Sequence, residues 1–158
     1  MFNCKITNDV EVLNMLNKLH PWIPSSKNIR PTPYDITLKQ NYIDKHLEKY
    51  KTVKDIVLYE ILKIDQNTDI NKINNTYLLE NKFPYQLPLK EETKHYILWF
   101  VSVKMTDSEI NNLLFNELSQ IYTNFEFIWY KNPKMSLPLE HENIEHIHVF
   151  VHIKAPKR

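Results

Sequence analysis

Three histidines alternate with apolar residues near the C-terminal end of the chain, in the segment 146–152, which reads His-Ile-His-Val-Phe-Val-His. This alternation is typical of a β-strand, whose successive side chains point to opposite faces. The aliphatic residues then form a core face, and His146 and His148 project from the other face, about 6.6 Å apart. Imidazole serves as a metal ligand, a proton carrier or a nucleophile near neutral pH. We therefore expect the working site on the histidine face, the alternative being a solvated face that tolerates polar residues.

The segment before this strand supplies further polar groups. Asn132 and Ser136 lie in a loop, 131–145, that leads from one expected strand to the next. We expect this loop to bring both side chains to the histidine face, where they would hold an oxyanion while His148 acts as nucleophile or base and His146 orients or protonates. The alternative is that Asn132 only forms the turn with Pro133.

His95 opens another strand of the same expected sheet. If the two strands are neighbours, His95 lies within reach of His146 and His148. Three imidazole nitrogens with one open position for water would suit a divalent metal such as zinc. The alternative for His95 is a polar residue at the end of a strand.

Aromatic residues could complete a ligand site. Tyr85, Trp99 and Trp129 carry rings large enough to stack on a base or a sugar, although such residues more often belong to a core. Tyr85 lies in the proline-rich turn 83–88, and we expect its ring to be buried while its hydroxyl finds a partner.

The elements that would position these residues make an α+β fold in one domain over 1–158. We expect an antiparallel sheet of strands 95–103, 125–130 and 146–153, the first of them covered on both faces. Capping residues and apolar spacing predict helices near 9–19, 38–50, 53–64 and 107–121. A proline-rich loop, 21–34, would be anchored by Trp22 and Tyr34, and 65–76 would be a loop.

Composition excludes several classes of protein. Twenty basic residues face nineteen acidic ones, so no global field favours nucleic acid or anionic lipid. The chain has no glycine, which excludes the glycine-rich phosphate loops. A single cysteine, Cys4, and the absence of a long apolar stretch favour a reducing, cytoplasmic location without membrane insertion.

One family resemblance rests on residues in a fixed order: Asn81-x-Phe83-Pro84-Tyr85, His95 to Trp99, Trp129-Tyr130-x-Asn132-Pro133, Ser136 and Glu145 to Val149. This order resembles the fungal N-acetylglucosamine-induced protein family, a domain of unknown function. Arg30-x-x-Pro33-Tyr34 fits the N-terminal half of that family. The resemblance implies a small intracellular protein with the histidines, Asn132 and Ser136 as recurring polar positions, and it adds Arg30 to the ligand-binding candidates Tyr85, His95 and Trp129.

A second resemblance is to the histidine-triad nucleotide hydrolases and transferases. His146-Ile147-His148-Val149 is similar to the first part of their signature strand, with His148 at the place of the residue that attacks phosphorus. Phe150 occupies the place of the third histidine. The resemblance implies phosphoryl or nucleotidyl transfer or hydrolysis on a nucleotide-like or sugar-phosphate substrate. The alternatives are a binding module for a small phosphorylated molecule or a metal, and a structural or interaction protein, for example a viral component.

Overall fold

The computed structural model describes residues 3–6, 10–23, 32–87, 92–130 and 143–154. Its elements follow in the order β1 (Asn3–Ile6), α1 (Val10–Leu19), α2 (Pro33–Leu47), α3 (Val53–Asp55), a π-helical segment η1 (Ile56–Ile61), a short 3₁₀ turn η2 (Ile70–Lys72), β2 (Asn75–Glu80), β3 (Thr93–Val101), α4 (Asp107–Ser119), β4 (Phe125–Tyr130) and β5 (Ile144–Ile153). The α+β fold class predicted from the sequence is confirmed.

One sheet of five strands organises the fold, in the order β1-β4-β5-β3-β2. The three predicted strands, β3, β4 and β5, are antiparallel neighbours with β5 in the middle. Two strands that were not predicted form the edges: β2 pairs antiparallel with β3, and β1 pairs parallel with β4. The start of β2 lies inside the segment 65–76 that was expected to be a loop.

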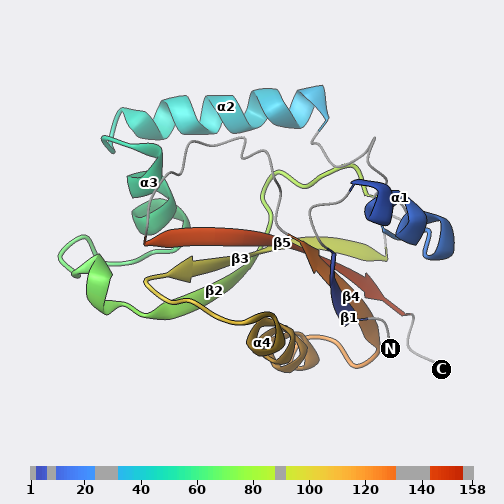
Figure 1. Ribbon diagram of the computed structural model, residues 1–158. Coiled ribbons are helices and arrows are strands. Elements are labelled where there is room, and N and C mark those ends of the chain that lie inside the picture. The colour runs from blue at the N-terminus through green and yellow to red at the C-terminus, as the bar shows by residue number, and fades with distance from the viewer. Residues whose placement is uncertain (1–2, 7–9, 24–31, 88–91, 131–142, 155–158) are drawn as a thin grey trace.

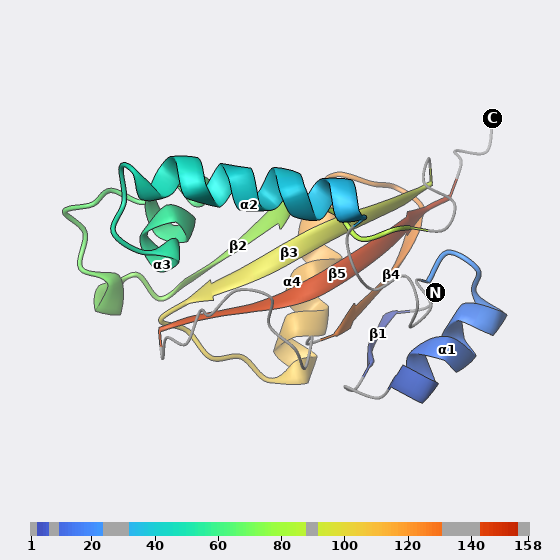
Figure 2. The ribbon, with the colours of Figure 1, turned by 90° about the horizontal axis from the view of Figure 1, so that it is seen from above.

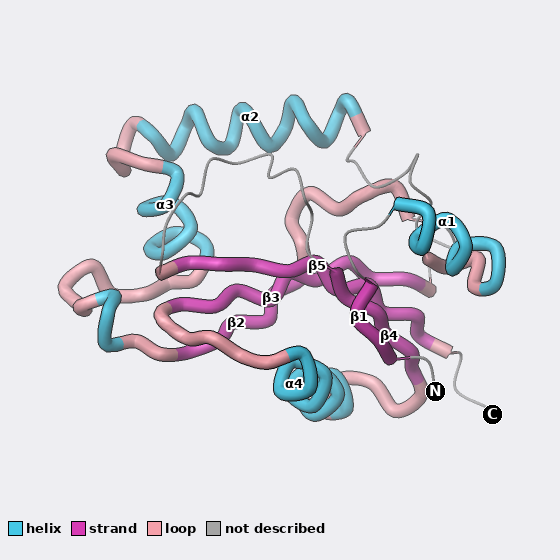
Figure 3. Tube along the Cα trace, in the orientation of Figure 1, coloured by secondary structure: helices cyan, strands magenta, loops and turns pink. Residues whose placement is uncertain are grey.

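Helices cover both faces of this sheet. Helix α4 lies below the sheet in the view of Figure 1, and α2 and α3 lie above it. From above, α2 runs across the sheet and α1 lies beside β1 (Figure 2). Figure 3 shows the same two helical layers around the strands. Among the described residues, no helix is long and apolar enough to cross a bilayer.

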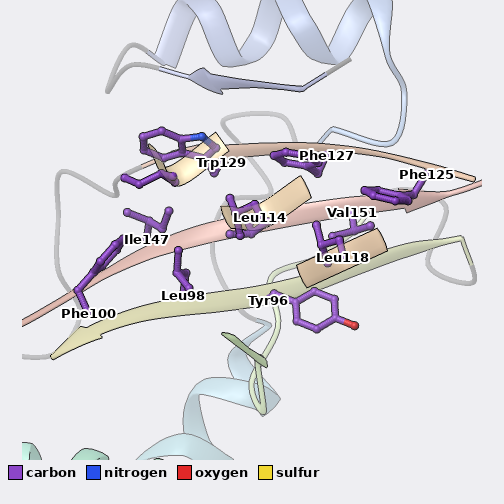
Figure 4. Packing of buried hydrophobic residues seen from close by; sticks show 12 residues of the cluster. Tyr96, Leu98, Phe100, Leu114, Leu118, Phe125, Phe127, Trp129, Ile147 and Val151 are labelled. Atoms are coloured by element: carbon purple, nitrogen blue, oxygen red, sulfur yellow. The ribbon is translucent and has the colours of Figure 1, made fainter. Parts of the chain in front are cut away.

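The face toward α4 holds the largest core (Figure 4). Leu114 and Leu118 of α4 are completely buried against Val149 and Val151 of β5. This confirms the sequence prediction that the aliphatic residues of β5 form a core face. Helix α4 begins with the predicted capping box, in which the Thr106 side chain and the Glu109 side chain each bind the other residue's backbone N–H.

The opposite face of the sheet, which carries the histidines, is also covered. Phe150 is completely buried there in a cluster with Trp22, and His148 is only 6% exposed. The alternative interpretation, a solvated histidine face, is therefore wrong for this part of β5. Trp22 and Ile23, which follow α1, and Tyr85, in the turn after β2, pack on this face, and alternation along one strand cannot reveal what covers its second face.

The helix boundaries differ from the predictions in two places. Helix α2 begins at Pro33 rather than at residue 38, because Thr32 caps it and proline is well suited to a first helical position. Tyr34 is consequently 71% exposed on α2 and is not the anchor that was expected, whereas Trp22 is 3% exposed. The helix predicted over 53–64 begins at its predicted cap, Thr52, and continues as η1, an uncommon π-helical segment of a kind found frequently at functional sites.

Candidate functional site

Two buried histidines meet on the covered face of the sheet. In the register of β3 and β5, His95 pairs with Phe150, and Ile97 pairs with His148. The two imidazoles are therefore diagonal neighbours, and His95 Nε2 lies 2.9 Å from His148 Nδ1. This contact confirms, for His148, the expectation that His95 lies within reach of the histidines of β5.

A turn after β2 holds the other side of His95. The backbone N–H of Tyr85 donates to His95 Nδ1 at 3.1 Å, and the Asn81 side-chain amide lies 3.4 Å from the same nitrogen. The orientation of that amide is set locally, because Asn81 Oδ1 accepts from the backbone N–H of Phe83 at 2.9 Å. Both ring nitrogens of His95 are thus occupied by named partners.

Tyr85 closes the arrangement above His148. Its ring stacks on the His148 ring at a centroid separation of 5.0 Å, and its hydroxyl lies 3.3 Å from His148 Nε2. The side chain is 8% exposed. The sequence prediction for Tyr85, a buried ring whose hydroxyl has a partner, is confirmed.

Burial determines the charge state of His95. The side chain is 1% exposed, and burial lowers its pKa from 6.5 to about 3. Transfer into a low-dielectric interior disfavours the charged imidazolium. His95 is therefore neutral at physiological pH.

Beside these residues lies a cleft of about 600 Å³ between the sheet and the helices above it. Its walls come from α2, from α3 and η1, from the end of β2 with the turn that follows it, and from β3 and β5. Tyr85, His146 and His148 all line it, and so do Trp99 and Ile97 of β3. The site therefore combines a largely apolar hollow with a few polar groups from the sheet.

His146 faces this cleft without joining the His95–His148 contact. Its ring packs on Trp99 at a centroid separation of 4.9 Å and lies edge-on to His148 at 5.5 Å. It is less buried than His148. His146 is consequently placed to touch a ligand in the cleft.

The charged side chains that line the cleft are Lys39, Glu60, Lys63, Glu80 and Lys82. Glu60 and Lys63 line it together and form an ion pair at 3.7 Å, and Tyr50 also donates to Glu60. Lys39 lines it from α2, and burial lowers the pKa of that amine below its ordinary value. Lys82 extends over the Tyr42 ring, with Nζ 4.3 Å from the centroid.

The structure does not bring Trp129 to this site. Trp129 pairs with Val149 in the sheet and points to the α4 face, where its indole N–H donates to Asn111 Oδ1 at 2.8 Å. A ligand-stacking role for Trp129 in this cleft is therefore wrong. The other predicted residues Arg30, Asn132 and Ser136 lie outside the described residues.

The three-histidine metal set does not form either. Within the described ranges, no group of three or more His, Cys, Asp or Glu residues is placed to hold a metal ion. His95 directs Nε2 at His148 and Nδ1 at the turn, so it has no nitrogen left for a shared ion. The geometry gives no support to zinc at His95, His146 and His148.

Sequence reasoning missed the residues on the helical side of the cleft. Lys39, Tyr42, Lys82 and Glu60 were not among the candidates, because they belong to no motif and only tertiary packing brings α2, η1 and the turn after β2 around the cleft. The π-helical turn that carries Glu60 has no reliable sequence signal. Asn81 and Phe83 did appear in the order of residues behind the family resemblance, and the turn they form is what binds His95.

Comparison of the chain with protein-family models, with curated proteins and with solved structures finds no match.

Proposed function

We propose that this chain is a small-molecule-binding domain whose cleft takes a planar, partly apolar ligand with an anionic group, in the nucleotide-like class. The observation that carries the proposal is the cleft of about 600 Å³ with three sheet residues, Tyr85, His146 and His148, in its wall. Ligand sites in proteins typically measure about 300–1,000 Å³ and combine apolar walls with a few polar groups.

Aromatic and aliphatic side chains supply the surface for the planar part. Trp99 and Ile97 of β3 lie in the wall with Phe83, and Tyr42 faces Phe83 edge-on at a centroid separation of 5.8 Å. Aromatic rings prefer offset or edge-to-face contacts with other rings, which suits a flat heterocycle. Burial of such a ligand against this wall would provide most of its binding free energy.

Lysine side chains supply positive charge for the anionic group of the ligand. Lys39 and Lys82 line the cleft from two different elements, beside Lys63, which pairs with Glu60, and beside Glu80. The pKa of Lys39 is lowered by burial, and an anion beside it would favour its charged form. A phosphate or sulfonate between these two amines would therefore bind more tightly than a neutral analogue.

The proposed ligand belongs to the nucleotide-like class expected from the sequence, and the proposal is for binding without catalysis. The oxyanion partners that catalysis was expected to need, Asn132 and Ser136, lie outside the described residues. Binding by the described cleft does not depend on them.

A fluorescence titration of the full chain with 8-anilinonaphthalene-1-sulfonate, an aromatic sulfonate with a flat naphthalene ring, tests the proposal. We expect saturable binding that AMP displaces at lower concentration than adenosine does, because only AMP carries the anion. Absence of saturable binding, or equal competition by AMP and adenosine, would contradict the proposal.

Two pairs of variants locate the bound probe. Lys39→Gln should weaken binding several-fold, whereas Lys45→Gln, at an exposed position of the same helix outside the cleft wall, should not. Leu79→Trp should obstruct the cleft from the β2 side, whereas Phe115→Trp on α4 should leave binding unchanged. Equal effects within either pair would show that the probe binds elsewhere.

A further inference from the structure

The hydrogen bonds around His95 have a direction that starts at the turn after β2. A backbone N–H is always a donor, so Tyr85 N–H must donate to His95 Nδ1. The Asn81 amide, oriented by its bond from Phe83 N–H, presents its own N–H to the same nitrogen. His95 Nδ1 is thus an acceptor, and a neutral imidazole then carries its proton on Nε2.

The same reasoning about donors and acceptors sets the tautomer of His148. His95 Nε2–H points at His148 Nδ1, 2.9 Å away, so that nitrogen must accept. The proton of neutral His148 is then on Nε2, which lies 3.3 Å from the Tyr85 hydroxyl. A second proton on His148 Nδ1 would place two N–H groups against each other in a buried contact.

We infer that the Asn81–Tyr85 turn sets the tautomers of both histidines, so that the side of His148 toward the Tyr85 hydroxyl and the cleft carries an N–H rather than a lone pair, which favours ligands with an oxygen acceptor. The ligand part of this inference rests on the proposed function. The neutrality of His95, whose pKa burial lowers to about 3, supports the proton count.

These tautomers have a consequence for catalysis. A neutral imidazole attacks phosphorus through its unprotonated nitrogen, and in His148 that nitrogen is Nδ1, which faces His95 in the interior. The nitrogen on the side of Tyr85 and the cleft carries the proton. His148 therefore acts together with the Tyr85 hydroxyl in determining specificity, rather than as the nucleophile suggested by the resemblance to histidine-triad enzymes.

The tautomers can be read without any ligand. Two-bond ¹H–¹⁵N correlation spectra of the ¹⁵N-labelled full chain at pH 7 should show both His95 and His148 protonated at Nε2 alone. His148 protonated at Nδ1, or at both nitrogens, would overturn the inference. Tyr85→Phe should leave both tautomers unchanged, since they are set from the other end of the chain of bonds. A switch of tautomer in that variant would refute the direction argued here.

A second measurement tests the ligand part. Saturation with AMP should shift the His148 Nε2–H resonance while Nδ1 stays unprotonated, as expected for donation to an oxygen. Bound AMP that leaves this resonance unmoved, or that moves the proton to Nδ1, would overturn acceptor selection while the binding proposal survives. If AMP does not bind but the tautomers are as expected, the proposed function fails and the tautomer assignment stands.

Discussion

Replacing His95 by glutamine should remove a large part of the acid sensitivity of the fold. The folded chain holds the pKa of His95 at about 3, against about 6.5 for an exposed histidine, because the ring is buried. Between these two values the unfolded chain binds a proton that the folded chain excludes. Stability is therefore fully present above about pH 6.5, falls as the pH drops, and levels off near pH 3.

The size of this acid-induced loss of stability follows from the lowering of the His95 pKa. Each pH unit inside the window costs about 1.4 kcal/mol, so acidification from pH 6.5 to 4.5 should cost about 3 kcal/mol through His95 alone. Glutamine does not titrate, and its amide keeps one donor and one acceptor. His95→Gln should be less stable than the wild type at pH 7 by about 1–3 kcal/mol, through imperfect hydrogen bonds, but should lose about 3 kcal/mol less on acidification.

Urea unfolding followed by tryptophan fluorescence at pH 7 and pH 4.5 measures both quantities. Phe150→Leu is the matched control, because Phe150 is fully buried with its ring 4.6 Å from that of His95, and the change loses packing without removing a titrating group. That variant should keep the full acid sensitivity of the wild type. If His95→Gln and the wild type lose the same free energy of unfolding between the two pH values, the buried neutral state assigned to His95 is refuted.

Two predictions concern the other face of the sheet. Leu114→Ala should cost about 2–5 kcal/mol of unfolding free energy, because Leu114 is fully buried, whereas Phe115→Ala beside it, at a position 41% exposed, should cost about 1 kcal/mol or less. A similar loss in both variants by urea unfolding would contradict the assignment of the α4 core. Thr106→Ala should lower the stability by about 0.5–2 kcal/mol through loss of the α4 cap, with the exposed Thr123→Ala as a control that should change it by less than about 0.5 kcal/mol. A melting temperature unchanged by the loss of the Thr106 cap would show that the capping box contributes nothing measurable.

Local signals in the sequence determined most of the elements. The alternation at 146–152 identified β5, and the capping residues Thr52 and Thr106 placed the starts of two helices. These signals are local because hydrophobic periodicity and capping depend on residues a few positions apart. Edge strand β2 was missed, since its mixed sequence carries no clear alternation and it is held mainly by pairing with β3.

In the candidate site too, some features follow from the sequence alone and others only from tertiary packing. Residue types and their spacing singled out His148, His146 and His95, because imidazole binds and moves protons near neutral pH, and singled out Tyr85 for a ring that could stack on a ligand. Which of them meet was decided by the sheet register and by the turn at Asn81, which place His95 between His148 and the Tyr85 backbone. The burial that keeps His95 neutral arises from the turn after β2 and from the rings of Tyr85 and Phe150 that pack on it, and the cleft lysines Lys39 and Lys82 come from α2 and from that same turn. The sequence thus determined the chemical groups, and only tertiary packing decided their partners, their charge and the hollow beside them, because these depend on residues distant along the chain.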